Sequence, residues 1–190
     1  EINRAKLSPM MQKYFETKDQ YPGCILFYRL GDFYEMFFDD AITASKALEI
    51  TLTGKECGLE ERAPMCGVPF HAADNYIDRL VKKGYRVAIA EQMEDPKLAK
   101  GLVKREVIRV VTPGTICDNK ALDETKNNYI MSIAYVGGIY GVSTCDVSTG
   151  EFYLTELKTK EQLEDELFKF TPAEVICCLL YTSDAADDRL

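Results

Sequence analysis

The chain has 190 residues, of which 46% are hydrophobic and 28% are charged, as is ordinary for a soluble globular protein. This length accommodates one large domain, or one complete domain and part of another. No apolar run approaches the roughly 20 residues needed to cross a bilayer, and the N-terminus lacks the apolar core of a secretory signal. These features predict a cytoplasmic protein with no membrane partner.

Seven cysteines and a single histidine, His71, bear on metal binding and disulfides. The cysteine count is odd and no Cys-x-x-Cys pair occurs, whereas structural zinc sites need closely spaced ligands. Without a secretion signal, the thiols are expected to be reduced and mostly buried. The sequence therefore predicts no metal site.

The net charge of −8 is unevenly distributed along the chain. Residues 1–115 carry 17 Lys and Arg against 17 Asp and Glu, whereas residues 116–190 carry 6 against 14. The first segment can present a basic face if its charges are segregated, but the second would repel phosphate. This change predicts a domain boundary near residue 115.

Expected helices and strands alternate over residues 1–115. Ser8 and Pro9 are a helix-start signal, because a capping hydroxyl precedes proline at the first helical position. Further helices are expected at 39–48 and 74–83, and strands at 24–30, 50–53, 85–91 and 107–111. A polar loop is expected at 54–62 and irregular chain at 64–71, because each proline removes an amide donor. This alternation predicts an α/β domain with a mixed sheet.

The remaining chain is expected to form a second, incomplete domain. Residues 116–127 are polar and are expected to form a linker. Strand-like runs at 129–136, 139–147 and 151–157 predict a meander, and a helix at 160–170 and a strand at 173–176 follow. This order indicates an α/β domain cut short, at residues 128–178. Residues 179–190 show no core pattern and are expected to be a non-native tail.

Residues 31–38, Gly-Asp-Phe-Tyr-Glu-Met-Phe-Phe, place an acid between aromatic residues directly after the strand at 24–30. Side chains alternate in extended chain, so two sets face opposite ways, namely Phe33, Glu35 and Phe37 against Tyr34, Met36 and Phe38. The first set combines an apolar ring with a carboxylate on one surface. The ring can insert into a stacked ligand, and the carboxylate can hydrogen-bond the polar edge of that ligand. The second set is expected in the core. The residue pattern alone favours core packing for Phe33 too, because aromatic side chains are mostly buried.

Five segments, which follow one another along the chain, carry a resemblance to a known family. They are Ser-Pro-Met-Met-Gln-Lys-Tyr at 8–14, Leu-Phe-Tyr-Arg-Leu-Gly-Asp-Phe-Tyr-Glu at 26–35, Pro-Met-Cys-Gly-Val-Pro-Phe-His at 64–71, Ala-Ile-Ala-Glu-Gln-Met-Glu-Asp-Pro at 88–96 and Arg-Val-Val-Thr-Pro-Gly-Thr at 109–115. Together they resemble the N-terminal part of the bacterial MutS family of DNA mismatch-recognition proteins, over roughly residues 5–176. The resemblance implies a mixed-sheet mismatch-binding domain at residues 1–115, followed by a truncated connector domain with an RNase H-like fold.

The resemblance also implies how DNA is bound. In the family a Phe-x-Glu element enters the minor groove, and here Phe33 matches the phenylalanine and Glu35 the glutamate. The ring is expected to unstack and kink a mispaired base step, and Glu35 is expected to hydrogen-bond an exposed base edge. Lys55 aligns with a basic residue near the DNA backbone. With Arg62 it is expected to contact phosphate, the alternative being a solvated loop.

Three further residues complete the expected DNA-binding set. Met65 and Pro69 are expected to shape the loop that precedes the helix at 74–83. His71 is included with them, although the residues alone favour a structural hydrogen bond near the start of that helix, and a catalytic-base role lacks an accompanying nucleophile. No catalytic residue is expected.

Two other functions are open on the sequence alone. Asp146 and Glu151 can be read as metal-binding carboxylates of an RNase H-like nuclease, but two-metal nucleases need several converging carboxylates. The acidic connector piece is alternatively a protein-interaction module of a repair complex.

A cofactor is not expected within this chain, because it lacks a Gly-x-x-x-x-Gly-Lys-Ser/Thr phosphate loop. The resemblance implies ATP and Mg binding and a homodimer for the full-length family proteins. It also implies mismatched duplex DNA and downstream mismatch-repair proteins as partners, and a cytoplasmic, nucleoid-associated location.

Overall fold

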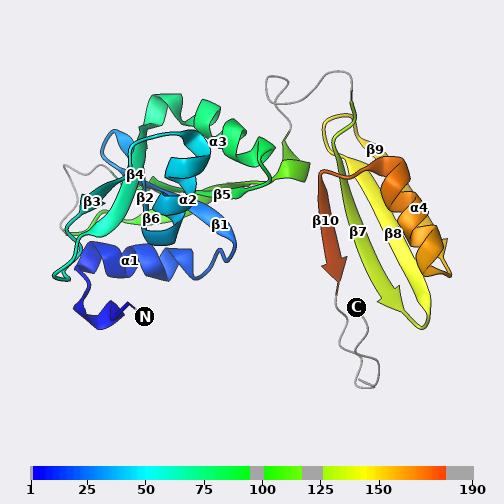
Figure 1. The fold of residues 1–190 in the computed structure, drawn as a ribbon, viewed down its shortest axis with the longest axis horizontal. Coiled ribbons are helices and arrows are strands. Elements are labelled where there is room, and N and C mark those ends of the chain that lie inside the picture. Colours follow the sequence, from blue (N-terminus) through cyan, green and yellow to red (C-terminus); the bar gives the residue numbers. More distant parts are fainter. Residues whose placement is uncertain (1, 95–100, 117–125, 179–190) are drawn as a thin grey trace. The chain divides into compact units, whose positions relative to one another are not determined.

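The computed structural model describes residues 2–94, 101–116 and 126–178, and it divides into compact units at residues 1–112 and 113–190 (Figure 1). Each unit has its own sheet, and each is described by itself. Strands and helices mix in both units, so the predicted mixed α/β fold is confirmed. Within the described residues, no helix combines the length and apolarity needed to cross a membrane.

The first unit is built on a mixed sheet of six strands in the order β3-β4-β2-β1-β5-β6. The strands are β1 (Cys24–Leu30), β2 (Phe33–Phe37), β3 (Thr53–Lys55), β4 (Ala63–Pro69), β5 (Arg86–Gln92) and β6 (Arg105–Val111). β1 and β5 are parallel, and all other neighbours are antiparallel. The β1–β2 hairpin therefore lies in the middle of the sheet, with a strand on either side of it.

Helices cover both faces of this sheet. They are α1 (Pro9–Lys18), α2 (Phe38–Leu48) and α3 (Ala73–Lys82), with short 3-10 helices η1 (Arg4–Lys6) and η2 (Phe70–Ala72). α1 and α3 lie on opposite sides of the sheet (Figure 1). α1 buries Met11 and Tyr14 in a cluster with Tyr28 and Phe37 of the sheet. α2 packs against β4 and α3. The face that carries Phe37 is thus the α1 side of the sheet.

A buried carboxylate ties three of these elements together. Asp40 of α2 accepts hydrogen bonds from the Leu26 amide at 2.9 Å and the Tyr14 hydroxyl at 3.3 Å. Its other oxygen pairs with the Lys18 ammonium at 2.8 Å. These partners offset the cost of removing the carboxylate from water. The contact fixes the start of α2, which follows β2 directly.

Two expectations for this unit are wrong. Residues 64–71 were expected to be irregular, but 63–69 form β4. Pro64 lies outside the pairing of β4 with β2, and Pro69 outside its pairing with β3, so each proline has a neighbouring strand on one side only. The strand expected at 50–53 begins at Thr53 and continues through Lys55, because pairing with β4 sets its limits.

The described part of the second unit is a sheet in the order β10-β7-β8-β9 with one helix packed on it. Its elements are η3 (Pro113–Thr115), β7 (Tyr129–Val136), β8 (Ile139–Asp146), β9 (Glu151–Leu157), α4 (Lys160–Phe170) and β10 (Glu174–Cys178). The meander and the helix match their predicted ranges to within one residue. Thr159 and Gln162 form a capping box at the start of α4. Phe170 packs at 5.1 Å from the ring of Tyr129.

Several predictions for this part fall on residues that are not described. Most of the predicted linker at 116–127, and all of the predicted non-native tail at 179–190, lie outside the described residues. The predicted domain limits therefore stay predictions.

Candidate nucleic-acid interface

The β1–β2 hairpin turns through Gly31 and Asp32. Gly31 has φ +59, in the left-handed region where a residue without Cβ is favoured. The Asp32 carbonyl accepts a hydrogen bond from the Phe70 amide at 2.9 Å, which ties the turn to the chain that follows β4. Phe33 comes next, opposite Leu30 on one side and Pro69 on the other. An anchored turn and two paired strands therefore set the position of Phe33.

The side chains of β2 alternate between the two faces of the sheet, as predicted. Tyr34 and Met36 are buried on one face. On the α1 side, Phe33 is 46% exposed and Glu35 is half-buried. An exposed ring and a carboxylate thus lie two residues apart on one surface, beyond the part of the sheet that α1 covers.

The two phenylalanines at the end of the motif pack in the core, and only the face expected for Phe38 was wrong. Phe37 lies on the same face of β2 as Phe33, as expected, but it is buried there under α1, with its ring 5.1 Å from that of Tyr14. Phe38 was expected on the opposite face. It has φ 53 and begins α2, so its ring packs on the α1 side, 5.1 Å from Phe15. The strand lasts only five residues because α2 starts there.

Gly67 of β4 leaves room for both motif side chains, and sequence reasoning missed it. A Cβ at this position would lie 3.7 Å from Phe33 Cδ1, 3.6 Å from Glu35 Cγ and 3.3 Å from the Tyr34 carbonyl oxygen. Phe33 and Glu35 therefore lie over the bare backbone of Gly67. Glycine inside a strand is a signal of such close approach, but the expectation of irregular chain at 64–71 hid it.

Lys55 is brought to the same surface, and it pairs with the motif carboxylate. It lies in β3, two strands away from β2, and its Nζ is 2.5 Å from Glu35 Oε2. The ammonium also lies 5.7 Å from the centre of the Phe37 ring. The side chains are 33% exposed for Lys55 and 15% for Glu35. The loop lysine expected from the sequence is thus a strand residue in a shielded ion pair.

The other expected site residues are placed differently from one another. Met65 and Pro69 share the α1 side of β4 with Gly67, and both are half-buried. Arg62 is exposed and packs beside Gly54, which alternates with Lys55 along β3 and so faces the other way. His71 is exposed in η2, 5.9 Å from the ring of Phe70. The structure therefore gathers Phe33, Glu35, Lys55, Met65 and Pro69 on one face, while Arg62 and His71 lie beside it.

The opposite face of the hairpin is held by a polar cluster that the sequence analysis did not single out. Arg29 pairs with Glu91 of β5 at 3.1 Å, and the Tyr34 hydroxyl donates to the other oxygen of Glu91. Burial, and then this hydrogen bond, raises the pKa of Tyr34 to about 12. The Arg29 guanidinium stacks on the ring of Phe70 at 3.8 Å, and Phe70 stays 42% exposed. Phe70 is therefore a second exposed ring, but on the side of Arg29 rather than of Glu35.

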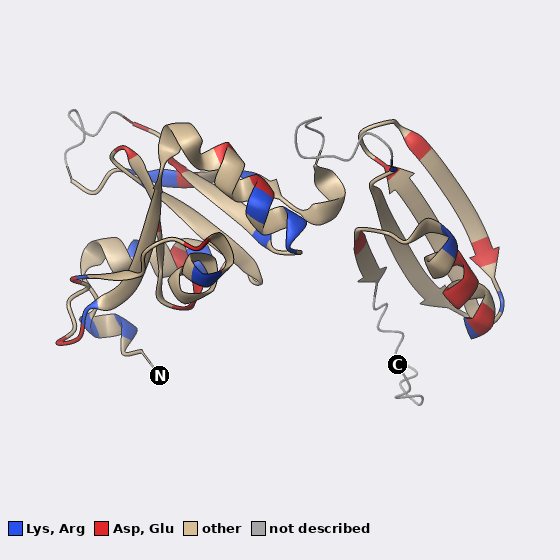
Figure 2. Cartoon of the chain, turned by 45° about the horizontal axis from the view of Figure 1, so that its top comes forward, with Lys and Arg blue, Asp and Glu red and all other residues tan. Residues whose placement is uncertain are grey.

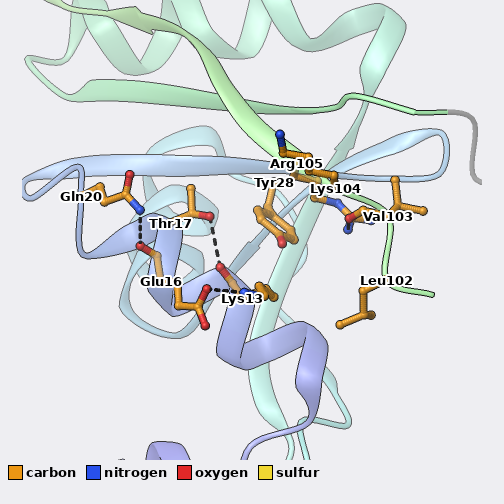
Figure 3. Close-up of a pocket in the computed structure, with 9 residues that line it drawn as sticks. All are labelled: Lys13, Glu16, Thr17, Gln20, Tyr28, Leu102, Val103, Lys104 and Arg105. Atoms are coloured by element: carbon orange, nitrogen blue, oxygen red, sulfur yellow. Dashed lines mark hydrogen bonds and ion pairs between the residues drawn. The ribbon is translucent and has the colours of Figure 1, made fainter. Parts of the chain in front are cut away.

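Two basic side chains around the start of β6 have partners within the unit. Lys104 pairs with Glu106 at 2.6 Å, and Arg105 donates to the Arg29 carbonyl at 2.6 Å. Both line a pocket of about 320 Å³ between α1 and the start of β6, in which Arg105 lies 5.0 Å from the ring of Tyr28 (Figure 3). The pocket lining includes three basic residues, Lys13, Lys104 and Arg105, and one acid, Glu16, which pairs with Lys13 at 2.6 Å.

Basic residues also gather at the C-terminal end of α3 (Figure 2). Arg79 donates to the Leu48 carbonyl at 2.8 Å, and Lys83 to the Ala47 carbonyl at 2.5 Å. Both therefore cap the C-terminal end of α2, where cations are favoured. This cluster is accounted for by the fold.

The candidate nuclease carboxylates face each other across β8 and β9. Asp146 is buried and accepts from the Ser148 hydroxyl at 2.6 Å and the Asn128 amide at 2.9 Å. Burial would raise the pKa of Asp146, but these hydrogen bonds outweigh it and lower the pKa. Glu151 accepts from the Tyr129 hydroxyl at 2.9 Å. In the described part of the chain, no group of three or more His, Cys, Asp or Glu side chains is arranged to hold a metal ion.

Comparison with known proteins identifies the family. A family model described as MutS domain I matches residues 8–120, and one described as MutS domain II matches residues 128–188. The chain is 64% identical over 173 residues to the DNA mismatch repair protein MutS of Lachnoclostridium phytofermentans, which covers 91% of this chain and 19% of that protein. It is 59% identical over 176 residues to the protein of the same name from Clostridioides difficile, and this match covers 93% of the chain and 18% of that protein.

The chain thus spans about a fifth of the length of the curated relatives it matches. The two domain models follow one another along the chain, and the first of them alone covers more than half of it. The chain belongs to the MutS family.

Proposed function

We propose that this chain recognises mispaired or unpaired bases in duplex DNA by inserting Phe33 into the minor groove, with Glu35 beside it. The observation that carries the proposal is a phenylalanine ring left 46% exposed on an anchored hairpin in the middle of a sheet. Binding side chains are held most precisely when strands or helices of the scaffold carry them, as the hairpin carries Phe33. The relatives described above are named as DNA mismatch repair proteins, which agrees with this function.

Deformability of the base step is the proposed signal. Inserting a ring unstacks a step at a cost of a few kcal/mol, and bending the duplex adds on the order of 1–6 kcal/mol. Stacking of a base on the ring returns about 1–3 kcal/mol. The free energy gained by stacking does not offset the cost of unstacking and bending a well-paired step. A mispaired step has already lost part of its pairing, so it opens at lower cost and is bound in preference.

Glu35 adds a hydrogen bond to a base edge of the opened step. Its carboxylate lies next to Phe33 over Gly67, where it can accept a hydrogen bond from a base edge, or donate one when protonated. Near phosphates an anionic side chain also disfavours binding where no such hydrogen bond forms. The pair therefore combines stacking with discrimination against matched DNA.

Five other residues complete the proposed interface. Met65 and Pro69 flank Phe33 on the same face, and Lys55 takes part through its ion pair with Glu35. Arg62 and His71 are exposed beside this face and are proposed to contact the DNA backbone.

For the whole protein we propose a homodimer that acts in mismatch repair with downstream repair proteins, in the cytoplasm at the nucleoid. The domain at residues 1–115 binds DNA, and residues 128–178 begin the connector domain. The order of the two family models supports this division. The chain contains no phosphate-loop motif, so ATP and Mg binding is proposed for the full-length protein, and no catalytic step is assigned to these residues.

Titration of two labelled duplexes that differ by one G·T mismatch tests this function. Fluorescence anisotropy is measured with the 190-residue chain at two salt concentrations, because phosphate contacts weaken with salt. We expect the mismatched duplex to bind more tightly at both concentrations, since salt weakens the phosphate contacts that the duplexes share. Equal affinity for the two duplexes at both concentrations would contradict the proposal.

A further inference from the structure

The ion pair between Lys55 and Glu35 joins two strands that are not neighbours. β4 lies between β3 and β2, and at the paired positions it carries the small residues Ala63, opposite Lys55, and Gly67, opposite Glu35. The Lys55 side chain crosses β4 on the α1 side of the sheet and ends 2.5 Å from Glu35 Oε2. The ammonium is directed at Glu35 and at the Phe37 ring.

The shielding of this pair sets it apart from the surface pairs of the unit. The Glu35 side chain is 15% exposed, whereas the Lys13–Glu16 pair has side chains 60% and 59% exposed. Exposed pairs hold their side chains weakly, but a shielded carboxylate that loses its partner is left uncompensated. Removing Lys55 would therefore free the Glu35 carboxylate to turn toward water, away from its place beside Phe33.

We propose that Lys55 is a positioning residue, which acts on DNA through Glu35 rather than by contacting phosphate itself. It holds the carboxylate over Gly67 beside the Phe33 ring and balances its charge as the phosphates approach. This inference rests on the proposed function, and it assigns the role of Lys55 within that same site. It also differs from the phosphate contact expected from the sequence.

A double-mutant cycle separates the two roles of Lys55. Lys55→Met is made in the wild-type chain and in the Glu35→Gln variant, and the affinities for mismatched and matched duplexes are measured in each. Lys55→Arg keeps the positive charge and serves as the conservative variant. Thermal unfolding followed by circular dichroism confirms that each variant is folded before DNA is added.

A positioning role makes the effect of Lys55→Met depend on Glu35. We expect Lys55→Met to lower the mismatch preference about fivefold or more in the wild-type chain, and by less than about twofold in the Glu35→Gln variant. The slope of the logarithm of affinity against the logarithm of salt concentration is expected to stay unchanged. Lys55→Arg is expected to keep most of the wild-type mismatch preference. Equal losses in both backgrounds, with a salt slope reduced by about one, would show a phosphate contact and overturn the inference.

Failure of the proposed function gives a different result. A wild-type chain with no mismatch preference would overturn the function, and the inference with it. A wild-type chain that prefers the mismatch, but whose Lys55→Met effect is independent of residue 35, would overturn the inference alone.

Discussion

Replacement of Phe33 by alanine removes the proposed wedge while leaving the core of the first unit in place. The ring is 46% exposed, and its near neighbour below is the bare backbone of Gly67. Truncating a fully buried phenylalanine costs about 3–5 kcal/mol, so a ring that is half in water should cost roughly 2 kcal/mol of the free energy of unfolding. The variant is therefore expected to fold.

The effect on binding is expected to fall on mismatched DNA. Loss of stacking on the ring removes about 1–3 kcal/mol, which corresponds to a loss of about 5- to 150-fold in affinity for the mismatched duplex. Matched duplex does not accept the ring, so its affinity should change by less than about twofold. The preference for mismatched DNA is thus expected to disappear, as measured by anisotropy with labelled duplexes.

Phe70→Ala is the matched control, because it removes the same side chain at nearly the same exposure, 42% against 46%. Phe70 stacks on Arg29 on the other side of the hairpin, so its removal should leave the mismatch preference within about twofold of the wild-type value. The reasoning is refuted if Phe33→Ala retains the wild-type preference, or if Phe70→Ala loses as much of it as Phe33→Ala does.

Three further predictions use the same surface and its support. Gly67→Val is expected to displace Phe33 and Glu35, to cost about 1–3 kcal/mol of stability through overpacking, and to lower the mismatch preference; unchanged preference in a folded variant would contradict this. Glu35→Gln is expected to strengthen binding to matched duplex by removing a negative charge, and an unchanged matched-duplex affinity would argue against that role. Tyr34 has its pKa raised to about 12 in the folded state, so its contribution to stability is present in full below about pH 10 and is lost as the pH rises to about 12. In urea denaturation, Tyr34→Phe should lose less stability over that interval than the wild-type chain, and equal losses would contradict the assignment.

Local pattern predicted much of this fold because the deciding interactions are local. The meander and α4 were placed to within a residue, since turn glycines and the cap at Thr159 act over a few residues. β4 was missed because its prolines are tolerated only through the arrangement of its neighbours, β2 on one side and β3 on the other. Strand order of this kind is not visible in a short stretch of sequence.

The same distinction applies to the candidate site. Alternation along β2 correctly separated Phe33 and Glu35 from Tyr34, because it depends on backbone geometry alone. The burial of Phe37 depends on where α1 packs, and the pairing of Lys55 with Glu35 depends on β3 lying two strands from β2. These contacts join residues about 20 apart in the chain, so spacing could not reveal them.

Unstacking of a base step by Phe33 is the central claim, and the fluorescence of 2-aminopurine tests it most directly. This base emits weakly when stacked, so it is placed next to a mismatch and its emission is followed as the chain is added to saturation. We expect the wild-type chain to raise the emission, and Phe33→Ala at saturation to leave it at the level of the free duplex. An equal rise with both proteins, or no rise with the wild-type chain at saturation, would contradict the claim.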